Sequence, residues 1–190
     1  MPRLLATLFA LALASSPCVA DPLQLHPQYS PSFFKARQKV IDPDKMVYGL
    51  AFGATEAELI KAFGDPSGVI AASETVKVLL YGSSHLFVLR KGKFRELLIA
   101  DHVIDWRVAR RMERVAFFDG GSWTLAPGIQ AQMSFEEVAS KLKKSPAKPG
   151  YRLTYETSNA EVELEFSSTS ENGKETGYVL RGVSIKNHGD

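Results

Sequence analysis

A segment of the chain occurs twice, at a constant spacing of 79 residues. The first copy begins at Gly49 and reads GLAFGATEAELIKAFGDP, and the second begins at Gly128 and reads GIQAQMSFEEVASKLKKSP. In each copy a hydroxyl residue, Thr55 or Ser134, precedes a glutamate by three positions, which is the capping-box pattern at the start of a helix. Each copy therefore predicts one short amphipathic helix.

Strand-like segments follow each predicted helix. From Ala160 to Phe166 apolar residues alternate with glutamates, which predicts a strand with one face on a core and an acidic face in water. Short turns separate the segments, except for a longer loop from Ser167 to Gly177, so each half is predicted to contain a three-stranded antiparallel meander. The predicted strands are 76–81, 85–89 and 94–99 in the first half, and 151–155, 160–166 and 178–185 in the second.

These patterns predict an α+β fold of two tandem repeats joined by a connector helix. Each repeat is a short helix plus a three- to four-stranded antiparallel sheet. The pattern leaves open whether the repeats form one continuous sheet, and it leaves the oligomeric state open. The predicted boundaries are 1–20 for a signal peptide, 21–45 for an extended lead-in with a short helix from Pro31 to Ile41, 46–100 for the first repeat, 101–122 for the connector helix and a turn, and 123–190 for the second repeat.

The first twenty residues have the pattern of a secretory signal. Arg3 supplies a positive charge, and the apolar run Leu4–Ala14 would reach only about 16 Å as a helix, too short for a bilayer core of about 30 Å. Cleavage is expected near Ala20, so the protein is predicted to be periplasmic or secreted. The alternative is that Cys18 is a lipidation site, but Pro17 before it fits that pattern poorly.

A set of motif positions is shared between the halves. In the first half these are Gly49, Ala54-Thr55, Glu58, Gly64-Asp65-Pro66 and Tyr81-Gly82; in the second they are Gly128, Met133-Ser134, Glu137 and Tyr155, with Lys143 in place of Gly64. The arrangement resembles the small bacterial envelope modules of the SmpA/OmlA (outer-membrane assembly lipoprotein) type, and the tandem modules of the beta-lactamase-inhibitor-protein family. The resemblance covers roughly residues 46–187. It implies an exported protein that binds other proteins through a sheet face and loops, and it implies no catalytic residue.

The connector, residues 101–122, carries the most pronounced candidate binding surface. Ile104, Val108, Met112 and Val115 recur at helical spacing, and arginines occupy another face of the same predicted helix. Such guanidinium groups suit anionic lipid, lipopolysaccharide phosphates or an acidic protein patch, although a solvated face is the simpler interpretation. The candidate binding residues are Arg107, Arg110, Arg111, Arg114 and Trp123, and a second basic cluster near a hairpin turn comprises Arg90, Lys91, Lys93 and Arg95.

The chain shows no motif for catalysis or for a cofactor. The formal net charge of +2 gives no case for nucleic-acid binding. Paired histidine spacing is missing, and the closest ligand group, Asp101, His102 and Asp105, is more simply interpreted as acids at the positive end of a helix. His85 beside Ser84 does not form a nucleophile elbow. We therefore predict no catalytic residue, no metal site and no cofactor.

The leading hypothesis is a non-enzymatic exported module that binds an envelope or secreted protein, in cell-envelope assembly or maintenance. The alternatives are a secreted inhibitor of a hydrolase, a protein that binds anionic lipid or lipopolysaccharide, and a small hydrolase or metal enzyme that uses Asp101, His102 and Asp105. Exposed aromatic residues on a concave sheet would favour the inhibitor. Tyr81, Phe87, Trp106, Trp123 and Tyr155 are the aromatic residues in question, and a core position is the simpler interpretation for each.

Overall fold

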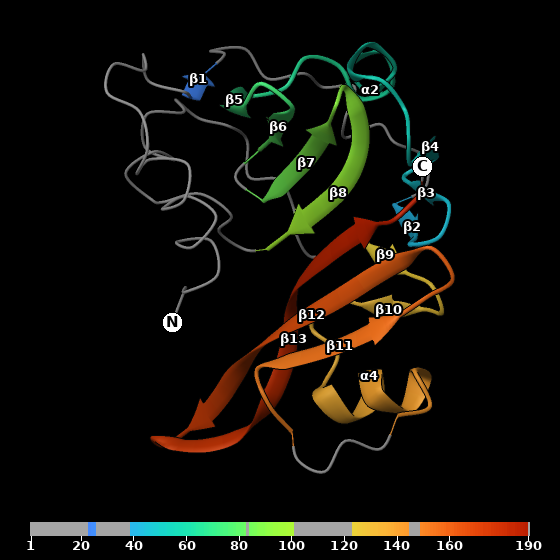
Figure 1. The fold of residues 1–190 in the computed structure, drawn as a ribbon. Coiled ribbons are helices and arrows are strands. Elements are labelled where there is room, and N and C mark those ends of the chain that lie inside the picture. Colours follow the sequence, from blue (N-terminus) through green and yellow to red (C-terminus); the bar gives the residue numbers. More distant parts are fainter. Residues whose placement is uncertain (1–22, 26–38, 83, 101–122, 145–148, 190) are drawn as a thin grey trace.

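The computed structural model describes residues 23–25, 39–82, 84–100, 123–144 and 149–189. These ranges contain thirteen strands and two short helices (Figure 1). Neither helix is long and apolar enough to cross a membrane. The helices are α2 (Glu56–Phe63) and α4 (Phe135–Lys141). The strands are β1 (Leu23–Leu25), β2 (Val40–Asp42), β3 (Met46–Val47), β4 (Leu50–Ala51), β5 (Gly68–Ser73), β6 (Val76–Tyr81), β7 (His85–Arg90), β8 (Lys93–Ile99), β9 (Thr124–Leu125), β10 (Ile129–Gln130), β11 (Arg152–Glu156), β12 (Ala160–Glu171) and β13 (Lys174–Asn187).

Eight of the strands form one antiparallel sheet in the order β1-β5-β6-β7-β8-β13-β12-β11. The two halves of the chain meet where β8 pairs with β13, from Ile99 opposite Val183 to Glu96 opposite Lys186. A smaller sheet has the order β10-β9-β2-β3-β4, and in it β2 and β9 run parallel. Both sheets therefore take strands from both halves of the chain.

The predicted fold class, α+β with two tandem repeats joined by a connector helix, is wrong. The described structure is mostly β, and its two helices are only eight and seven residues long. The physical reason lies at β8 and β13, because each would leave a row of unpaired backbone N–H and C=O groups at the edge of a separate module. Pairing them satisfies both edges. The connector helix predicted for 101–122 lies outside the described residues.

The predicted lead-in helix is also wrong where it can be compared. Val40 and Ile41, its predicted last residues, belong to strand β2, and the rest of the prediction lies outside the described residues. The backbone carbonyl of Asp42 accepts a hydrogen bond from Lys45 N, and the side-chain Oδ1 of Asp42 accepts one from Asp44 N. This turn leads the chain into β3. Val40 and Ile41 are β-branched and favour a strand, and the tight turn after them makes a hairpin rather than a helix.

The repeated segment has the same local structure in both copies. Thr55 and Ser134 each accept a hydrogen bond from the amide of the glutamate three residues on, and each glutamate bonds back to the cap amide. Both predicted capping boxes are thus confirmed. Gly49 and Gly128 adopt φ values of 87° and 91°, a left-handed backbone that favours glycine.

The loop before each helix is bonded to a long strand of the large sheet. In the first copy Phe94 N donates to Ala54 O at 2.8 Å, and in the second Leu180 N donates to Met133 O at 2.9 Å. The repeat therefore attaches α2 to β8 and α4 to β13 in the same way. Its two copies serve one sheet rather than two modules.

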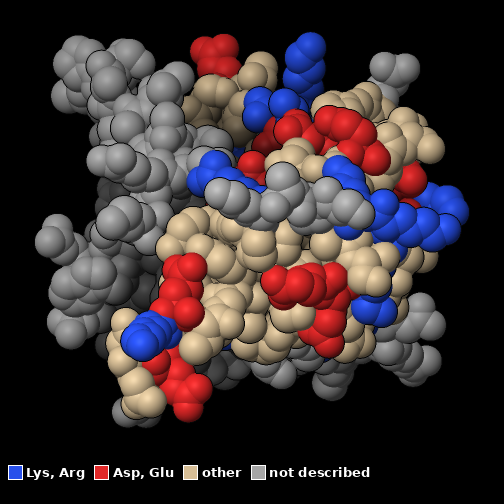
Figure 2. Space-filling view, turned by 90° about the horizontal axis from the view of Figure 1, so that it is seen from below, with Lys and Arg blue, Asp and Glu red and all other residues tan. Residues whose placement is uncertain are grey.

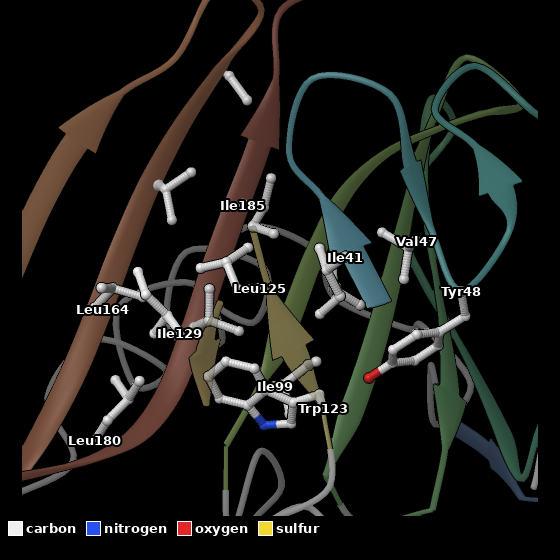
Figure 3. Packing of buried hydrophobic residues seen from close by; sticks show 14 of the residues in the cluster. Ile41, Val47, Tyr48, Ile99, Trp123, Leu125, Ile129, Leu164, Leu180 and Ile185 are labelled. Atoms are coloured by element: carbon white, nitrogen blue, oxygen red, sulfur yellow. The ribbon is translucent and has the colours of Figure 1, made fainter. Parts of the chain in front are cut away.

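The core lies on the inner face of the large sheet. Residues that pair across antiparallel strands share a face, so buried rows continue from the first half into the second. One such row, with every side chain fully buried, is Leu79, Phe87, Leu97, Ile185 and Val162. Ile41, Leu125 and Ile129 of the small sheet point into the same cluster (Figure 3). A single core therefore spans both halves.

The outer face of the large sheet differs between the halves. In the first half Ile70, Val78 and Val88 are buried on this face too, as the near-continuous apolar sequences of β6 and β7 indicate. The same row continues through charged residues in the second half: Glu96, Lys186 and Glu161. On β12 the predicted alternation is confirmed, because Val162, Leu164 and Phe166 are buried while Glu161, Glu163 and Glu165 are partly exposed.

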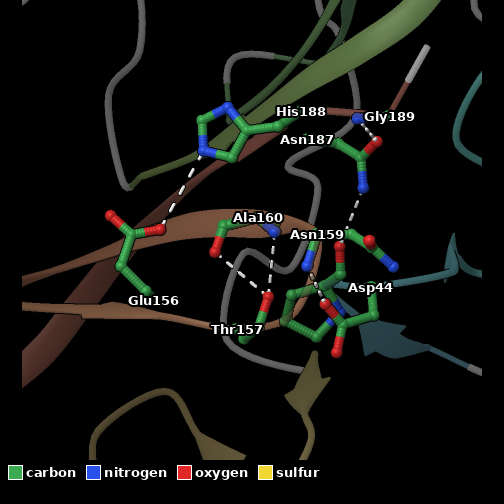
Figure 4. A network of polar contacts seen from close by, with 9 residues as sticks. Asp44, Glu156, Thr157, Asn159, Ala160, Asn187, His188 and Gly189 are labelled. Carbon is green, nitrogen blue, oxygen red and sulfur yellow. Dashed lines mark hydrogen bonds and ion pairs between the residues drawn. The ribbon is translucent and has the colours of Figure 1, made fainter.

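Polar contacts tie the small sheet to the second half (Figure 4). Asn187 Nδ2 donates to the Pro43 carbonyl at 3.3 Å, and the Asn159 amide donates to Asp44 Oδ1 at 2.8 Å. The β2–β3 turn is thereby held between the end of β13 and the β11–β12 turn.

A buried histidine joins the small sheet to the large one. His85 on β7 has no exposed surface, and its two ring nitrogens lie 2.9 Å from Tyr48 Oη and 2.9 Å from Ser84 Oγ. Burial, together with the charge of Lys39, lowers the pKa of His85 to about 3. Burial likewise raises the pKa of Tyr48. The neutral imidazole therefore belongs to the folded state.

We predict an acid-sensitive stability that depends on His85. In the unfolded chain His85 binds a proton as the pH falls below about 6.5, whereas in the folded protein it stays neutral down to about pH 3. The neutral, buried His85 therefore contributes its full stability above pH 6.5, and this contribution falls as the pH drops. The loss at pH 5 is about 2 kcal/mol. His85→Gln, which does not titrate, will lose less stability between pH 7 and pH 5 in denaturant unfolding. The exposed His188→Gln is the control, and an equal pH dependence in His85→Gln and wild type would contradict the account.

Candidate protein-binding ribbon

Of the five binding residues predicted from the sequence, the structure describes only Trp123. Arg107, Arg110, Arg111 and Arg114 lie outside the described residues. Trp123 is described, and its side chain is only 1% exposed within the core (Figure 3). It offers no surface to a partner in this structure. Trp123, which directly precedes β9, is therefore a core residue, and its large apolar ring favours burial.

The residues considered for catalysis form no accessible site in the part of the chain that the structure describes. Asp101, His102 and Asp105 lie outside the described residues, and within the described ranges no group of three or more His, Cys, Asp and Glu side chains could hold a metal ion. Ser84 and His85 form a contact that resembles part of a catalytic pair, but both side chains are buried. Their hydrogen bonds stabilise the junction of the two sheets.

A two-stranded ribbon projects from the body of the protein (Figure 1). It consists of residues 167–178, where β12 and β13 continue beyond the strands that flank them, and we call it the ribbon. Its turn is Asn172-Gly173, and both residues have a positive φ (52° and 76°), which matches the twist of a two-residue hairpin. Most side chains from Ser167 to Thr176 are exposed.

The β12 edge of the ribbon is open. Strand β11 pairs with β12 only as far as Glu165, and one further bond runs from Phe166 N to Tyr151 O at 2.8 Å. Backbone groups in an antiparallel strand alternate between the two sides, so Ser168 and Ser170 follow Phe166 in turning their N–H and C=O away from β13. Among the described residues no strand pairs with this side of 167–171.

The β12 edge is also the more regular edge of the ribbon. The pairing of β12 with β13 shifts register twice, and at each shift the extra residue, Arg181 or Thr176, belongs to β13. Such bulges twist a strand and interrupt its alternation. The segment Ser167–Glu171 is uninterrupted and contains no lysine or proline, the residues that commonly block an edge.

The neighbouring edge of the sheet, on β11, is blocked. Lys144 Nζ donates to the carbonyl of Thr154 at 2.7 Å, and it lies over the ring of Tyr155 at 5.9 Å from the centroid. A carbonyl that points outward from the middle of β11 is therefore already occupied. The protein closes one part of this edge and leaves the following part, on β12, open.

An aromatic pair lies at the base of the open edge. Tyr151 is 58% exposed, and its ring meets that of Tyr178 edge-on, with the centroids 5.1 Å apart. Tyr178 Oη donates to Glu175 Oε1 at 2.8 Å, and this hydrogen bond raises the pKa of Tyr178 to about 12. Tyr178 is thus fixed in place, and Tyr151 offers an apolar face beside Phe166.

Charge does not dominate this end of the molecule. On the face seen from below in Figure 2, Lys and Arg side chains and Asp and Glu side chains form small separate groups rather than one field of a single sign. The segment Ser167–Ser170 is uncharged. The open edge of the ribbon therefore offers backbone hydrogen-bonding groups and an aromatic contact rather than a charged surface.

No family model, no curated protein and no solved structure matches the chain. The resemblance to SmpA/OmlA-type modules and to the beta-lactamase-inhibitor-protein family therefore stays a prediction. Exposed aromatic residues on a sheet would favour an inhibitor. Four of the aromatic residues considered for this role are buried: Tyr81, Phe87, Trp123 and Tyr155. The fifth, Trp106, lies outside the described residues.

The sequence pattern does not predict the ribbon. Apolar alternation stops at Phe166, so the pattern predicts a strand that ends there and a loop over 167–177. One remaining signal was the β-propensity of Thr169 and Thr176. In the structure their Oγ1 atoms lie 3.1 Å apart across the ribbon. The pair Asn172-Gly173 was the second signal, since this dipeptide favours a hairpin turn.

Tyr151 is predicted to contribute little to folding. Because its side chain is largely exposed, Tyr151→Ala should lower the free energy of unfolding by less than about 1 kcal/mol. The matched core variant is Phe166→Ala, which removes a buried ring that contacts Phe135 and should cost about 3–5 kcal/mol. Denaturant unfolding compares the two. A similar cost for both variants would show that Tyr151 is a structural residue.

Proposed function

We propose that the chain is a non-enzymatic, exported protein-binding module that acts in cell-envelope assembly or maintenance. The observation that carries the proposal is the open β12 edge of the ribbon beside the exposed Tyr151. The signal-like segment 1–20 supports export to the periplasm or the outside of the cell. The burial of Ser84 and His85 supports a role without catalysis.

The partner contributes an extended segment that adds a strand to the sheet. Its backbone pairs with the outward N–H and C=O groups of Ser168 and Ser170, in the manner of β-augmentation. The open stretch spans five residues, from Ser167 to Glu171, which is the length of an ordinary strand. An apolar side chain of the partner packs on Tyr151 and Tyr178, since aromatic residues supply much of the binding energy at protein interfaces.

The experiment places a photo-crosslinking side chain at position 151 and captures the partner in cells. Ser168→Pro removes the outward N–H while leaving the bonds to β13, because proline is accepted at an edge whose N–H faces away from the sheet. We expect Ser168→Pro to abolish capture of the partner. Ser168→Ala, which keeps the N–H, should leave capture unchanged.

Two results would contradict the proposal. One is capture that Ser168→Pro and Ser168→Ala affect equally, which would mean that the backbone edge is not used. The other is a captured partner whose crosslinked residues lie in a folded surface rather than in an extended segment, as mass spectrometry of the crosslinked peptide would reveal. Circular dichroism of both variants checks that the sheet is intact.

A further inference from the structure

A cleft lined mostly by cations lies at the other end of β13 from the ribbon. Its volume is about 560 Å³. Lys186 at the cleft follows Lys174 at the ribbon tip by twelve positions along the strand, which corresponds to about 40 Å. The cleft is therefore independent of the ribbon. It is lined by Arg90, Lys91, Lys93, Arg95, Glu96, Lys186, Asn187 and Gly189.

Strand pairing brings these cations together from three strands. Arg90 and Lys93 face each other across the β7–β8 hairpin, whose turn residues Lys91 and Gly92 both have a positive φ. Lys186 on β13 then pairs with Glu96 on β8. Part of this cluster was recognised in the sequence, but Lys186 is nearly one hundred residues away and joins it only through the β8–β13 pairing.

A bulge directs Arg95 toward the cleft. The register of β7 and β8 shifts between Val88 and Leu89, so Arg95 is the extra residue on β8. Its Nη1 lies near Gly189, where an added Cβ would stand 3.4 Å away. Bulges commonly re-aim a side chain in this way.

Most cations of the cleft form no ion pair within the described structure. Glu96 is the one acid of the lining, and its Oε1 already accepts from Arg90 Nε at 2.5 Å. The remaining cations have no ion pair within 4.0 Å among the described residues. Glu161 is opposite Lys186, and the pKa of Glu58 is lowered by hydrogen bonds with Thr55 and, to a smaller extent, by the charge of Lys93. These cations are Lys91, Lys93, Arg95 and Lys186.

We infer that the cleft binds a phosphate monoester group. Such a group carries about −1.5 to −2 charges and three acceptor oxygens, so it takes donors from several directions at once. The Arg95 guanidinium supplies a bidentate fork, and the lysine ammonium groups supply point charges. The volume admits a phosphate group together with the molecule that carries it. The source of the group is either a membrane lipid or a small soluble molecule.

The test titrates the purified full chain with inorganic phosphate and, separately, with vesicles that contain phosphatidic acid. We expect Lys91→Glu and Arg95→Glu to weaken phosphate-dependent binding by at least about tenfold. Lys174→Glu makes the same charge change at the ribbon tip and should leave binding unchanged. Lys91 is on an exposed turn, so Lys91→Glu should fold normally and keeps the test valid even if Arg95→Glu disturbs the fold. Thermal melting of both variants checks that they are folded.

The outcomes separate the sources and can overturn the inference. Variant-sensitive binding of inorganic phosphate alone supports a soluble ligand, and variant-sensitive binding of phosphatidic acid vesicles, with none of phosphatidylserine vesicles, supports a lipid head group. Equal weakening by Lys174→Glu would show that only the overall charge matters. Failure of both inorganic phosphate and phosphatidic acid vesicles to bind would also overturn the inference.

Discussion

The pairing of β8 with β13 is the interaction on which the rest of the structure depends. Only four residue pairs join these strands, from Ile99–Val183 to Glu96–Lys186. They convert two meanders into one eight-stranded sheet, and they carry the buried row of Leu97 and Ile185 across the junction. Without this pairing each meander would have an unprotected edge and half of a core. The small sheet adds further contacts between the halves, from Pro43 to Asn187 and from Asp44 to Asn159.

Both proposed binding sites follow from the length of β13. The strand is fourteen residues long, and β8 pairs with only four of them. At its beginning it extends past the body and, with β12, forms the ribbon that carries the open edge. At its end it brings Lys186 beside the β7–β8 hairpin and completes the cationic cleft. One strand therefore supports a backbone-dependent site and a charge-dependent site, which are far enough apart to be occupied at the same time.

The local elements could be predicted from the sequence, and the arrangement could not. Thr55-x-x-Glu58 and Ser134-x-x-Glu137 contain the whole capping interaction within four residues, so the pattern was sufficient. The alternation of Val162, Leu164 and Phe166 likewise identifies a strand face. The choice between two sheets and one depends on Ile99 meeting Val183, and no local pattern encodes that contact. The ribbon was missed because Ser167–Ser170 faces water on both sides, which removes the apolar period that marks a strand.

Native-state hydrogen exchange tests the single-sheet account most directly. The account predicts that the slowest-exchanging amides of β7 and β8 and those of β12 and β13 open with the same free energy, close to that of global unfolding, because one sheet and one core unfold together. Leu97 and Ile185 should be among these most protected residues. Two groups of amides with clearly different opening free energies, one in each half, together with rapid exchange at Leu97 and Ile185, would show that the halves are separate modules and would contradict the account.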